Sequence, residues 1–206
     1  MNRFDTAAFT WDEKPVRVNI AKNIAEKIKE LVPLNQNMKV LDFGCGTGLL
    51  SFFLQPYVGE IAGIDTSKGM IEVFDKKIKE NQIENMKCLN LDIYTDKLSE
   101  KYDLIVSSMV FHHIKDISQI LKILYDYLNE DGYIAIADLV KEDGSFHDDN
   151  EGVEHFGFEI QEMENKLKEA GFKEIKSEIA HIVKKQRENE EREYPIFLIV
   201  GRKWWI

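Results

Sequence analysis

The chain of 206 residues is poor in cysteine and in positive charge. Its two cysteines, Cys45 and Cys88, are too few for a disulfide framework and lie outside any metal-binding spacing, which favours a reducing compartment. The 37 Asp and Glu residues outnumber the 27 Lys and Arg residues, so the net charge is −10. Because binding to a phosphate backbone needs a dense cationic surface, this balance argues against a nucleic-acid partner.

Long apolar runs are also missing, since no stretch approaches the ~18 consecutive apolar residues of a membrane span. The first residues, 1–5, lack the apolar run of a signal peptide. We therefore expect a cytoplasmic protein with no membrane span. Hydrophobic residues make up 44% of the chain, enough for a sizeable core in one domain spanning residues 1–206.

The stretch from Val40 to Leu50 combines an apolar segment with closely spaced glycines. Residues 39–43 predict a buried strand, the glycines at 44, 46 and 48 a tight turn, and residues 49–54 the start of a helix. Glycine tolerates positive φ and has no Cβ, so a ligand can approach the backbone, and the helix N-terminus offers free N–H groups. The stretch therefore predicts a cofactor cradle.

Apolar strands alternate with amphipathic helices along the rest of the chain, which predicts a parallel sheet covered on both faces. The last two strands are joined by a charged stretch, 185–193, that is typical of a solvated turn, so they are expected to pair antiparallel. Residues 129–132 predict another turn. The predicted strands are 39–43, 61–65, 87–91, 102–108, 133–139, 173–184 and 194–201, and the predicted helices are 16–31, 49–54, 70–79, 117–128 and 159–170.

Two less regular regions are expected to surround the site. Residues 1–34 form an N-terminal arm and helix, and the aromatic residues in the arm predict either a flap packed on the domain or a lid with Trp11 and Arg17 facing a ligand. Residues 141–158 are rich in acids and glycine, and a loop this long in a compact domain is usually functional. We expect it to be a substrate lid.

The spacing of the glycines restricts the cofactor. It is G-x-G-x-G rather than the G-x-G-x-x-G of dinucleotide-binding folds. Asp65, at the end of the second strand, can accept from two ribose hydroxyls, and Asp92, after the third, from an exocyclic amine. Together with Asp42, these acids would repel a pyrophosphate but suit a cationic ligand. The pattern favours a nucleoside cofactor without a pyrophosphate.

The segment Val40–Gly48, with Asp65, Asp92 and the strands at 103–113 and 132–139, resembles the class I S-adenosylmethionine-dependent methyltransferases, in the group that includes small-molecule and quinone-biosynthesis enzymes. The arm, 4–21, is similar to an arm common in that group. The resemblance implies S-adenosyl-L-methionine as cofactor and S-adenosyl-L-homocysteine as product. It also implies an α/β, Rossmann-like fold, with a seven-stranded, mostly parallel sheet in order 3-2-1-4-5-7-6, the last strand antiparallel and helices on both faces.

The resemblance assigns roles around the cradle. The glycine loop would lie under the methionine portion, Asp42 would face its amino group, Asp65 would hold the ribose and Asp92 would contact adenine. The implied cofactor contacts are Asp42, Gly44, Cys45, Gly46, Gly48, Asp65, Thr66, Met70, Asp92, Ile93, Ser108 and Met109.

The acceptor pocket is expected between the arm and residues 141–158, with Trp11, Arg17 and His155 as substrate-binding residues. If the acceptor is a hydroxyl or an acidic carbon, His155 or His113 would be the catalytic base. Of the adjacent pair His112 and His113, one is expected to pack and the other to face the active-site mouth. No metal is expected, because the acids and histidines of 147–155 are typical of a solvated lid.

The predicted function is methyl transfer to a small-molecule acceptor by in-line displacement, which needs alignment and exclusion of water more than a nucleophile. Residues 107–110 replace the Asn-Pro-Pro-aromatic motif of base-amino methylation, and no Pro-Cys nucleophile is present. A non-catalytic S-adenosylmethionine-binding protein is an alternative, because no catalytic group is obvious. A NAD-dependent oxidoreductase is another, which the glycine spacing opposes. The acceptor, the methylated atom and the oligomeric state stay open.

Overall fold

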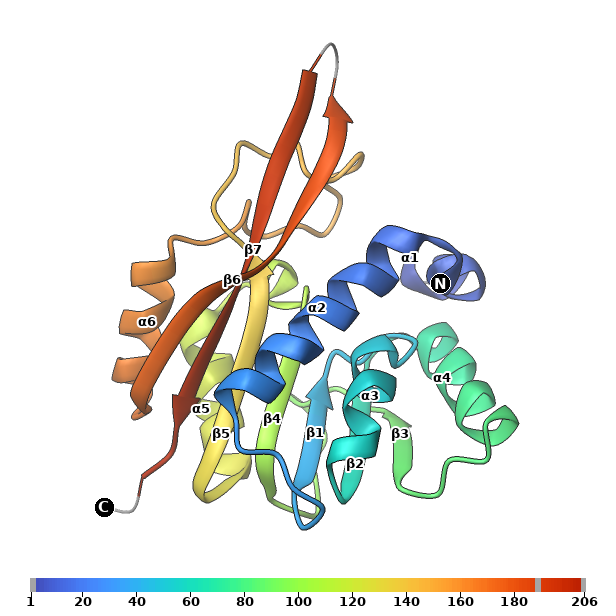
Figure 1. Ribbon diagram of the computed structural model, residues 1–206, viewed down its shortest axis with the longest axis vertical. Coiled ribbons are helices and arrows are strands. Elements are labelled where there is room, and N and C mark those ends of the chain that lie inside the picture. The colour runs from blue at the N-terminus through green and yellow to red at the C-terminus, as the bar shows by residue number, and fades with distance from the viewer. Residues whose placement is uncertain (1–2, 188–189, 205–206) are drawn as a thin grey trace.

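The computed structural model describes residues 3–187 and 190–204. A single seven-stranded sheet in the order β3-β2-β1-β4-β5-β7-β6 confirms the predicted strand order (Figure 1). As predicted, β7 alone runs against its neighbours, β5 and β6. The strands are β1 (Lys39–Phe43), β2 (Glu60–Asp65), β3 (Met86–Asn90), β4 (Tyr102–Ser108), β5 (Leu128–Leu139), β6 (Lys173–Arg187) and β7 (Glu190–Arg202).

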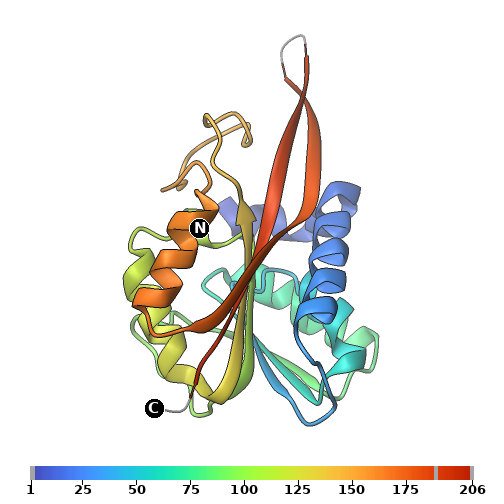
Figure 2. The same ribbon diagram turned by 60° about the vertical axis from the view of Figure 1, so that its left-hand side comes forward.

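Helices cover both faces of this sheet, which gives three layers (Figure 2). α2, α3 and α4 pack on one face, α5 and α6 on the other, and each layer has its own apolar core. The two cores follow from strand alternation, since Val40 belongs to the first and its neighbour Leu41 to the second. The helices are α1 (Arg3–Ala7), α2 (Pro15–Leu31), α3 (Leu49–Leu54), α4 (Lys68–Glu80), α5 (Ile117–Tyr127) and α6 (Ile160–Glu169), with short 3-10 turns η1 (Ala8–Glu13), η2 (Gln55–Tyr57) and η3 (Phe111–His113).

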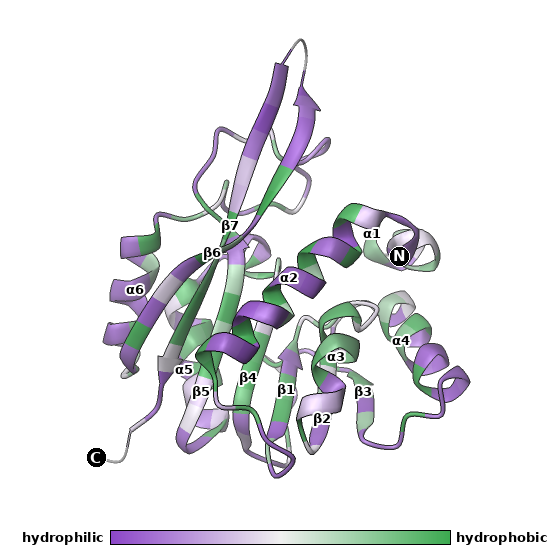
Figure 3. Cartoon of the chain, viewed as in Figure 1, coloured by the Kyte–Doolittle hydropathy of each residue, from purple (hydrophilic) through white to green (hydrophobic). Residues whose placement is uncertain are grey.

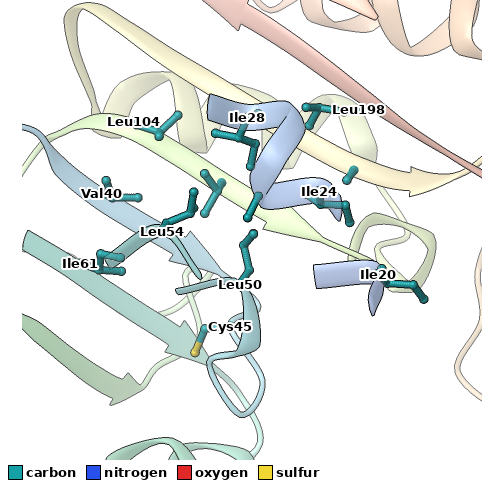
Figure 4. Packing of buried hydrophobic residues seen from close by; sticks show 14 of the residues in the cluster. Ile20, Ile24, Ile28, Val40, Cys45, Leu50, Leu54, Ile61, Leu104 and Leu198 are labelled. Carbon is teal, nitrogen blue, oxygen red and sulfur yellow. The ribbon is translucent and has the colours of Figure 1, made fainter. Parts of the chain in front are cut away.

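α2 lies across the sheet on an apolar stripe spaced at four residues (Figure 4). Its buried isoleucines, Ile20, Ile24 and Ile28, join the same core as Val40 and Leu198. Burying an isoleucine side chain contributes about 1.5–3 kcal/mol, so this stripe fixes the helix and, with it, the arm that precedes it. Pro15 occupies the first turn, where its missing N–H removes no hydrogen bond.

The prediction that residues 185–193 form a solvated turn is wrong. β6 and β7 stay paired through Lys185 opposite Arg192 and Arg187 opposite Glu190, and the hairpin extends well beyond the other strands (Figure 1). Opposite charges across the pair, such as Lys184 with Glu193 at 3.0 Å, stabilise strands whose composition is hydrophilic (Figure 3).

Residues 129–132 do not form the separate turn predicted between a helix and a strand. α5 ends at Tyr127, and these residues form an irregularity inside β5, where the register passes from Tyr102 opposite Leu128 to Leu104 opposite Tyr133. Smaller differences concern element ends. The strand predicted at 87–91 lies one residue earlier, and the helix predicted at 70–79 begins at Lys68 because the Ser67 side chain caps it.

Within 3–187 and 190–204, no helix is both long enough and apolar enough to cross a membrane.

Candidate functional site

The glycine loop after β1 is tied to the end of β2. The backbone N–H groups of Gly44 and Cys45 both donate to the Ile64 carbonyl, at 2.9 and 3.0 Å. Asp65 Oδ2 accepts from Gly46 N at 2.9 Å, and Oδ1 accepts from Ser67 N at 2.8 Å. One carboxylate therefore holds the cradle loop and the entry to α4 together, and each of its oxygens keeps a lone pair for a further donor.

The three cradle glycines have different surroundings, although all have positive φ. A Cβ at Gly44 would lie 2.4 Å from the Val110 side chain, and one at Gly48 would lie 2.4 Å from the Phe74 ring. At Gly46 the nearest atom is Met70 Sδ at 3.9 Å. Protein packing thus excludes side chains at 44 and 48, and Gly46 is the position where a ligand can approach the backbone.

Two carboxylates, the buried Asp42 and the half-buried Asp65, add negative charge to the cradle. Asp42 is buried and accepts from Ser51 Oγ at 2.6 Å. Burial, with a smaller contribution from the charge of Asp65, raises the pKa of Asp42 to about 7. Burial also raises the pKa of Asp65, against the opposing effect of its amide donors. A cationic ligand would favour the ionised form of both acids.

Cys45 is buried in the same loop, and burial raises the pKa of its thiol well above the ordinary value. A protonated, enclosed thiol is a poor nucleophile. The side chain also lies close to β2, because a Cβ at Gly63 would be 2.9 Å from Cys45 Sγ. Its environment is that of a packing residue.

The turn after β3 lies beside Asp65, because Leu91 N donates to the Asp65 carbonyl at 3.1 Å. Within this turn, Asp92 Oδ1 accepts from Tyr94 N at 3.0 Å. The remaining predicted contacts of this region are Met70 and Ile93, which are buried, and Thr66, which is exposed.

The end of β4 reaches the cradle through Val110, which packs against Gly44. Ser108 and Met109 precede it and are half-buried. Met109 has φ of 60°, which is uncommon for a residue with a side chain, and its N–H donates to the Ala137 carbonyl at 2.9 Å. Such backbone strain recurs at ligand-binding sites, so this geometry fits the predicted position near the reactive end of a cofactor.

Two acids of the arm clamp it onto the cradle. Asp12 Oδ1 accepts from Thr47 Oγ1 at 2.6 Å, and Asp12 Oδ2 pairs with Lys77 Nζ at 2.6 Å. Asp5 Oδ1 accepts from Ser67 Oγ at 2.7 Å and from Gly69 N at 3.0 Å, where the N-terminus of α4 favours an anion. Sequence reasoning missed both acids. Their alternation with aromatic residues in the arm was the available signal.

Trp11 and Arg17 are half-buried and contact each other. The Arg17 guanidinium stacks 3.4 Å from the Trp11 ring centroid, and its Nη1 donates to the Trp11 carbonyl at 3.2 Å. Trp11 contacts Phe4, with centroids 6.0 Å apart, and Phe4 contacts His113, with centroids 5.4 Å apart. The structure thus links the predicted acceptor residues of the arm to His113.

Of the two adjacent histidines, one is packed in the interior. His112 is buried, with Nδ1 2.7 Å from Asp138 Oδ1, and its backbone N donates to Asp138 Oδ2 at 3.1 Å. Sequence reasoning missed Asp138, an acid inside an otherwise apolar strand. His113 is half-buried, and its Nδ1 lies 2.7 Å from the Gly152 carbonyl. Because a carbonyl only accepts, Nδ1 of His113 carries the hydrogen and Nε2 carries the lone pair of the neutral ring.

His155 takes part in a different contact. Its Nε2 lies 2.9 Å from the Ile114 carbonyl, and its ring packs near Phe158. His155 and His113 both line an open groove of about 940 Å³ between the turn after β4 and residues 154–159. His113 therefore connects the two regions expected to hold the acceptor, the arm and the 141–158 segment.

Comparison with known proteins identifies the family. A model described as a methyltransferase domain matches residues 17–177. An uncharacterised methyltransferase of Schizosaccharomyces pombe is 35% identical over 149 residues, 65% of this chain and 52% of that protein. The ubiquinone biosynthesis O-methyltransferase of Pelagibacter ubique is 34% identical over 131 residues, 62% and 54% of the two chains. The chain thus spans about half the length of these relatives.

A solved structure shares the fold over its full length. It is the methyltransferase in the complex between the Haloferax volcanii Trm112 methyltransferase activator and its methyltransferase, with a TM-score of 0.79, 18% identity, and coverage of 100% of this chain and 99% of that one. The family match extends over well more than half of the chain, and the sheet order is the one predicted from the resemblance. The chain belongs to the methyltransferase-domain family, with the fold of the class I S-adenosylmethionine-dependent methyltransferases.

Proposed function

We propose that this chain transfers the methyl group of S-adenosyl-L-methionine to a small-molecule acceptor. The main support for the proposal is the position of the Asp65 carboxylate. It accepts hydrogen bonds from Gly46 N and Ser67 N and keeps lone pairs that can accept from two ribose hydroxyls. The raised pKa values of Asp42 and Asp65 add a preference for a cationic cofactor.

When bound, S-adenosylmethionine supplies a methyl group already activated on a sulfonium. The protein then has to align the acceptor and exclude water. The clamp of Asp12 on Thr47 and Lys77 would close the arm over the cofactor, and Ser108 and Met109 would border the reactive end. For a hydroxyl acceptor, His113 would take the proton at Nε2, held in place by the Gly152 carbonyl. His155, whose Nε2 lies 2.9 Å from the Ile114 carbonyl in the same groove, is the second candidate base.

The acceptor pocket would lie between the arm and the 141–158 segment, which we assign as the substrate lid of a single domain. A relative whose name gives an O-methyltransferase of ubiquinone biosynthesis supports a small acceptor. The acidic composition supports the absence of a nucleic-acid partner. The two cysteines are both free thiols, which supports a cytoplasmic location.

Calorimetry with S-adenosylmethionine and S-adenosylhomocysteine tests the proposal. We expect both to bind at one site per chain, and NAD(H) not to bind. Incubation with methyl-labelled S-adenosylmethionine and a panel of hydroxyl, amine and carboxyl acceptors then measures transfer. Absence of binding by either nucleoside would overturn the assignment. Binding without transfer to any acceptor would favour the non-catalytic alternative.

The raised pKa of Asp42 predicts a pH-dependent affinity. Because the cationic cofactor favours ionised Asp42, we expect its affinity to be about tenfold weaker at pH 6 than at pH 8. The raised pKa of Asp42 has the opposite effect on the stability of the free protein. Between pH 4, about the pKa of an unfolded carboxyl, and pH 7, folded Asp42 keeps a proton that the unfolded chain has lost. The free energy of unfolding should therefore fall as the pH rises from about 4 to about 7. Calorimetry between pH 6 and pH 8 measures the affinity, and Asp42→Asn should flatten its dependence on pH. If the affinity of this variant changed with pH as in the wild type, the role of Asp42 would be contradicted.

His113→Gln is expected to lower the rate of transfer to a hydroxyl acceptor about 100-fold, because a positioned base typically contributes at least that factor. The affinity for S-adenosylhomocysteine should stay within twofold of wild type. His155→Gln tests the second candidate base in parallel, and we expect this variant to retain most of the rate. If the His155 variant lost the rate instead, the base would be assigned to His155.

A further inference from the structure

The inner face of the β6–β7 hairpin carries positive charge toward the predicted acceptor region. Strand alternation places Val183, Lys185 and Arg187 on one face of β6, where Val183 is buried and the other two are half-buried. Lys184, on the opposite face, is exposed and pairs with Glu191 and Glu193, at 3.5 and 3.0 Å. The charge of Lys184 is thus neutralised across the hairpin. Pairing between the two strands does not account for Lys185 and Arg187 on the inner face.

Lys185 makes no ion pair within the described part of the chain. Its Nζ donates to the Phe146 carbonyl at 2.6 Å and lies 3.9 Å from the centroid of the Phe146 ring. Burial lowers the pKa of Lys185, and the neighbouring charge of Arg187 lowers it further. A carbonyl and an aromatic ring carry no formal negative charge, so they do not neutralise the ammonium, which can still attract an anion.

Arg17, in α2, resembles Lys185 in being a half-buried cation that stacks on an aromatic ring. It stacks on Trp11 and donates to a carbonyl, and no carboxylate lies within ion-pair distance in the described ranges. Burial lowers the pKa of Arg17 as well, with Asp12 acting in the other direction. Asp12, however, is already paired with Lys77. Arg17 therefore has a guanidinium with unused donors.

These cations are neighbours in space. α2 runs alongside β6, because Lys27 Nζ pairs with Glu178 at 3.2 Å and Asn23 Nδ2 lies 3.1 Å from His181 Nδ1, which directs the first turns of α2 toward the outer half of β6. In keeping with this arrangement, the charges of Lys14 and Arg17 contribute to the lowered pKa of Lys185. In Figure 2 the outer half of the hairpin has the 141–158 segment on one side and the beginning of α2 on the other. Asp148 is exposed and pairs with Arg187 at 2.5 Å, while Arg187 Nε is buried and donates to no atom of the described protein. Of the four cations, Lys14, Arg17, Lys185 and Arg187, only Arg187 is paired with a carboxylate within the described ranges, in a chain whose net charge is −10.

Aromatic contacts connect both cations to His113. On the arm side, Arg17 stacks on Trp11, Trp11 contacts Phe4, and Phe4 contacts His113. On the lid side, Lys185 stacks on Phe146, whose centroid is 4.8 Å from that of His147, and His147 lies 6.0 Å from His113. A molecule with its methyl-accepting atom near His113 would meet aromatic walls on two sides and the cations beyond them.

We propose that Arg17 and Lys185, flanked by Lys14 and Arg187, bind an anionic group of the methyl acceptor, a carboxylate or a phosphate. Without a ligand, half-buried cations of the same sign repel each other and lose hydration. An anion would reverse both effects, since the guanidinium can bind it through paired N–H donors and the ammonium through a point charge. The inference rests on the proposed function for its assignment to the acceptor.

Titration with inorganic phosphate and, separately, acetate tests the site at constant ionic strength, with chloride as the reference salt. The protein is saturated with S-adenosylhomocysteine, and NMR follows the indole N–H of Trp11. We expect a saturable shift with phosphate, with acetate or with both, and the responding anion gives the acceptor class. Lys185→Gln and Arg17→Gln should each weaken this binding at least tenfold, and Lys184→Gln, on the outer face, should leave it within twofold.

Lys185→Arg, which keeps the charge, should retain binding within a few-fold and so controls for lost folding, which melting curves also report. No saturable shift with either anion would overturn the inference. Equal anion affinity in Lys185→Gln and wild type would also overturn it, and would make Lys185 a structural tie to Phe146. The anion titration is repeated without S-adenosylhomocysteine, so that failure of the anion site can be told apart from failure of the proposed function. If the chain bound the anion but bound no S-adenosylhomocysteine, the methyltransferase assignment would be rejected and the anion site would stand.

Discussion

Replacing Asp65 with alanine should weaken the binding of S-adenosylhomocysteine about 1,000-fold. The variant would lose two hydrogen bonds from ribose to a carboxylate, each worth about 1.5–3 kcal/mol. It would also release Gly46 N and Ser67 N, which Asp65 holds at 2.9 and 2.8 Å, so the cradle loop would no longer be fixed to the entry of α4. Calorimetry on the wild type and the variant measures the difference.

A matched control separates this effect from a general loss of negative charge. Asp75→Ala removes an acid from the exposed side of α4, where it pairs with Lys79. That variant should bind S-adenosylhomocysteine within twofold of wild type. Asp65→Asn keeps one acceptor oxygen, so its affinity should lie between those of Asp65→Ala and Asp75→Ala. Undiminished binding in folded Asp65→Ala would remove the main support for the ribose assignment.

Gly48→Ala is expected to lower the free energy of unfolding by about 4 kcal/mol. The position has φ of 82°, which costs a residue with a Cβ about 1–2 kcal/mol. The new methyl would lie 2.4 Å from ring carbons of Phe74, a fully buried side chain, and overpacking of this kind costs about 1–3 kcal/mol. Urea unfolding followed by circular dichroism measures the change.

Gly152→Ala is the control for backbone strain alone. Gly152 has φ of 74°, but no atom lies within 4 Å of a Cβ placed there. We expect a loss of about 1 kcal/mol, since only the conformational cost applies. Equal losses at 48 and 152 would show that Phe74 adapts, and would contradict the view that packing, rather than a ligand, requires glycine at position 48.

The fold was largely predictable because its signals are local and periodic. β1 and β4 are built around short apolar runs, residues 40–41 and 104–106, and α2 repeats isoleucine at four-residue spacing. The hairpin was the exception. Its outer half is as hydrophilic as a loop, and it is a strand pair because cross-strand partners such as Lys184 and Glu193 neutralise each other. Such pairing depends on register, which composition does not reveal.

The candidate site was predictable where a motif fixes the geometry. Gly46 and Asp65 follow from the glycine spacing and from the position of an acid at a strand end, and the structure joins them by a hydrogen bond. Asp5, Asp12 and Lys185 could not be found in this way. Each acts on a residue more than 30 positions away, so only the three-dimensional arrangement shows what it contacts.

A crystal structure of the chain with bound S-adenosylhomocysteine tests whether the cradle is the cofactor site. We expect both ribose hydroxyls to lie within hydrogen-bond distance of the Asp65 carboxylate, with the amino-acid portion passing over Gly46 and the sulfur directed toward Met109. A nucleoside bound elsewhere, for example in the groove beside His155, with Asp65 contacting only Gly46 and Ser67, would contradict it.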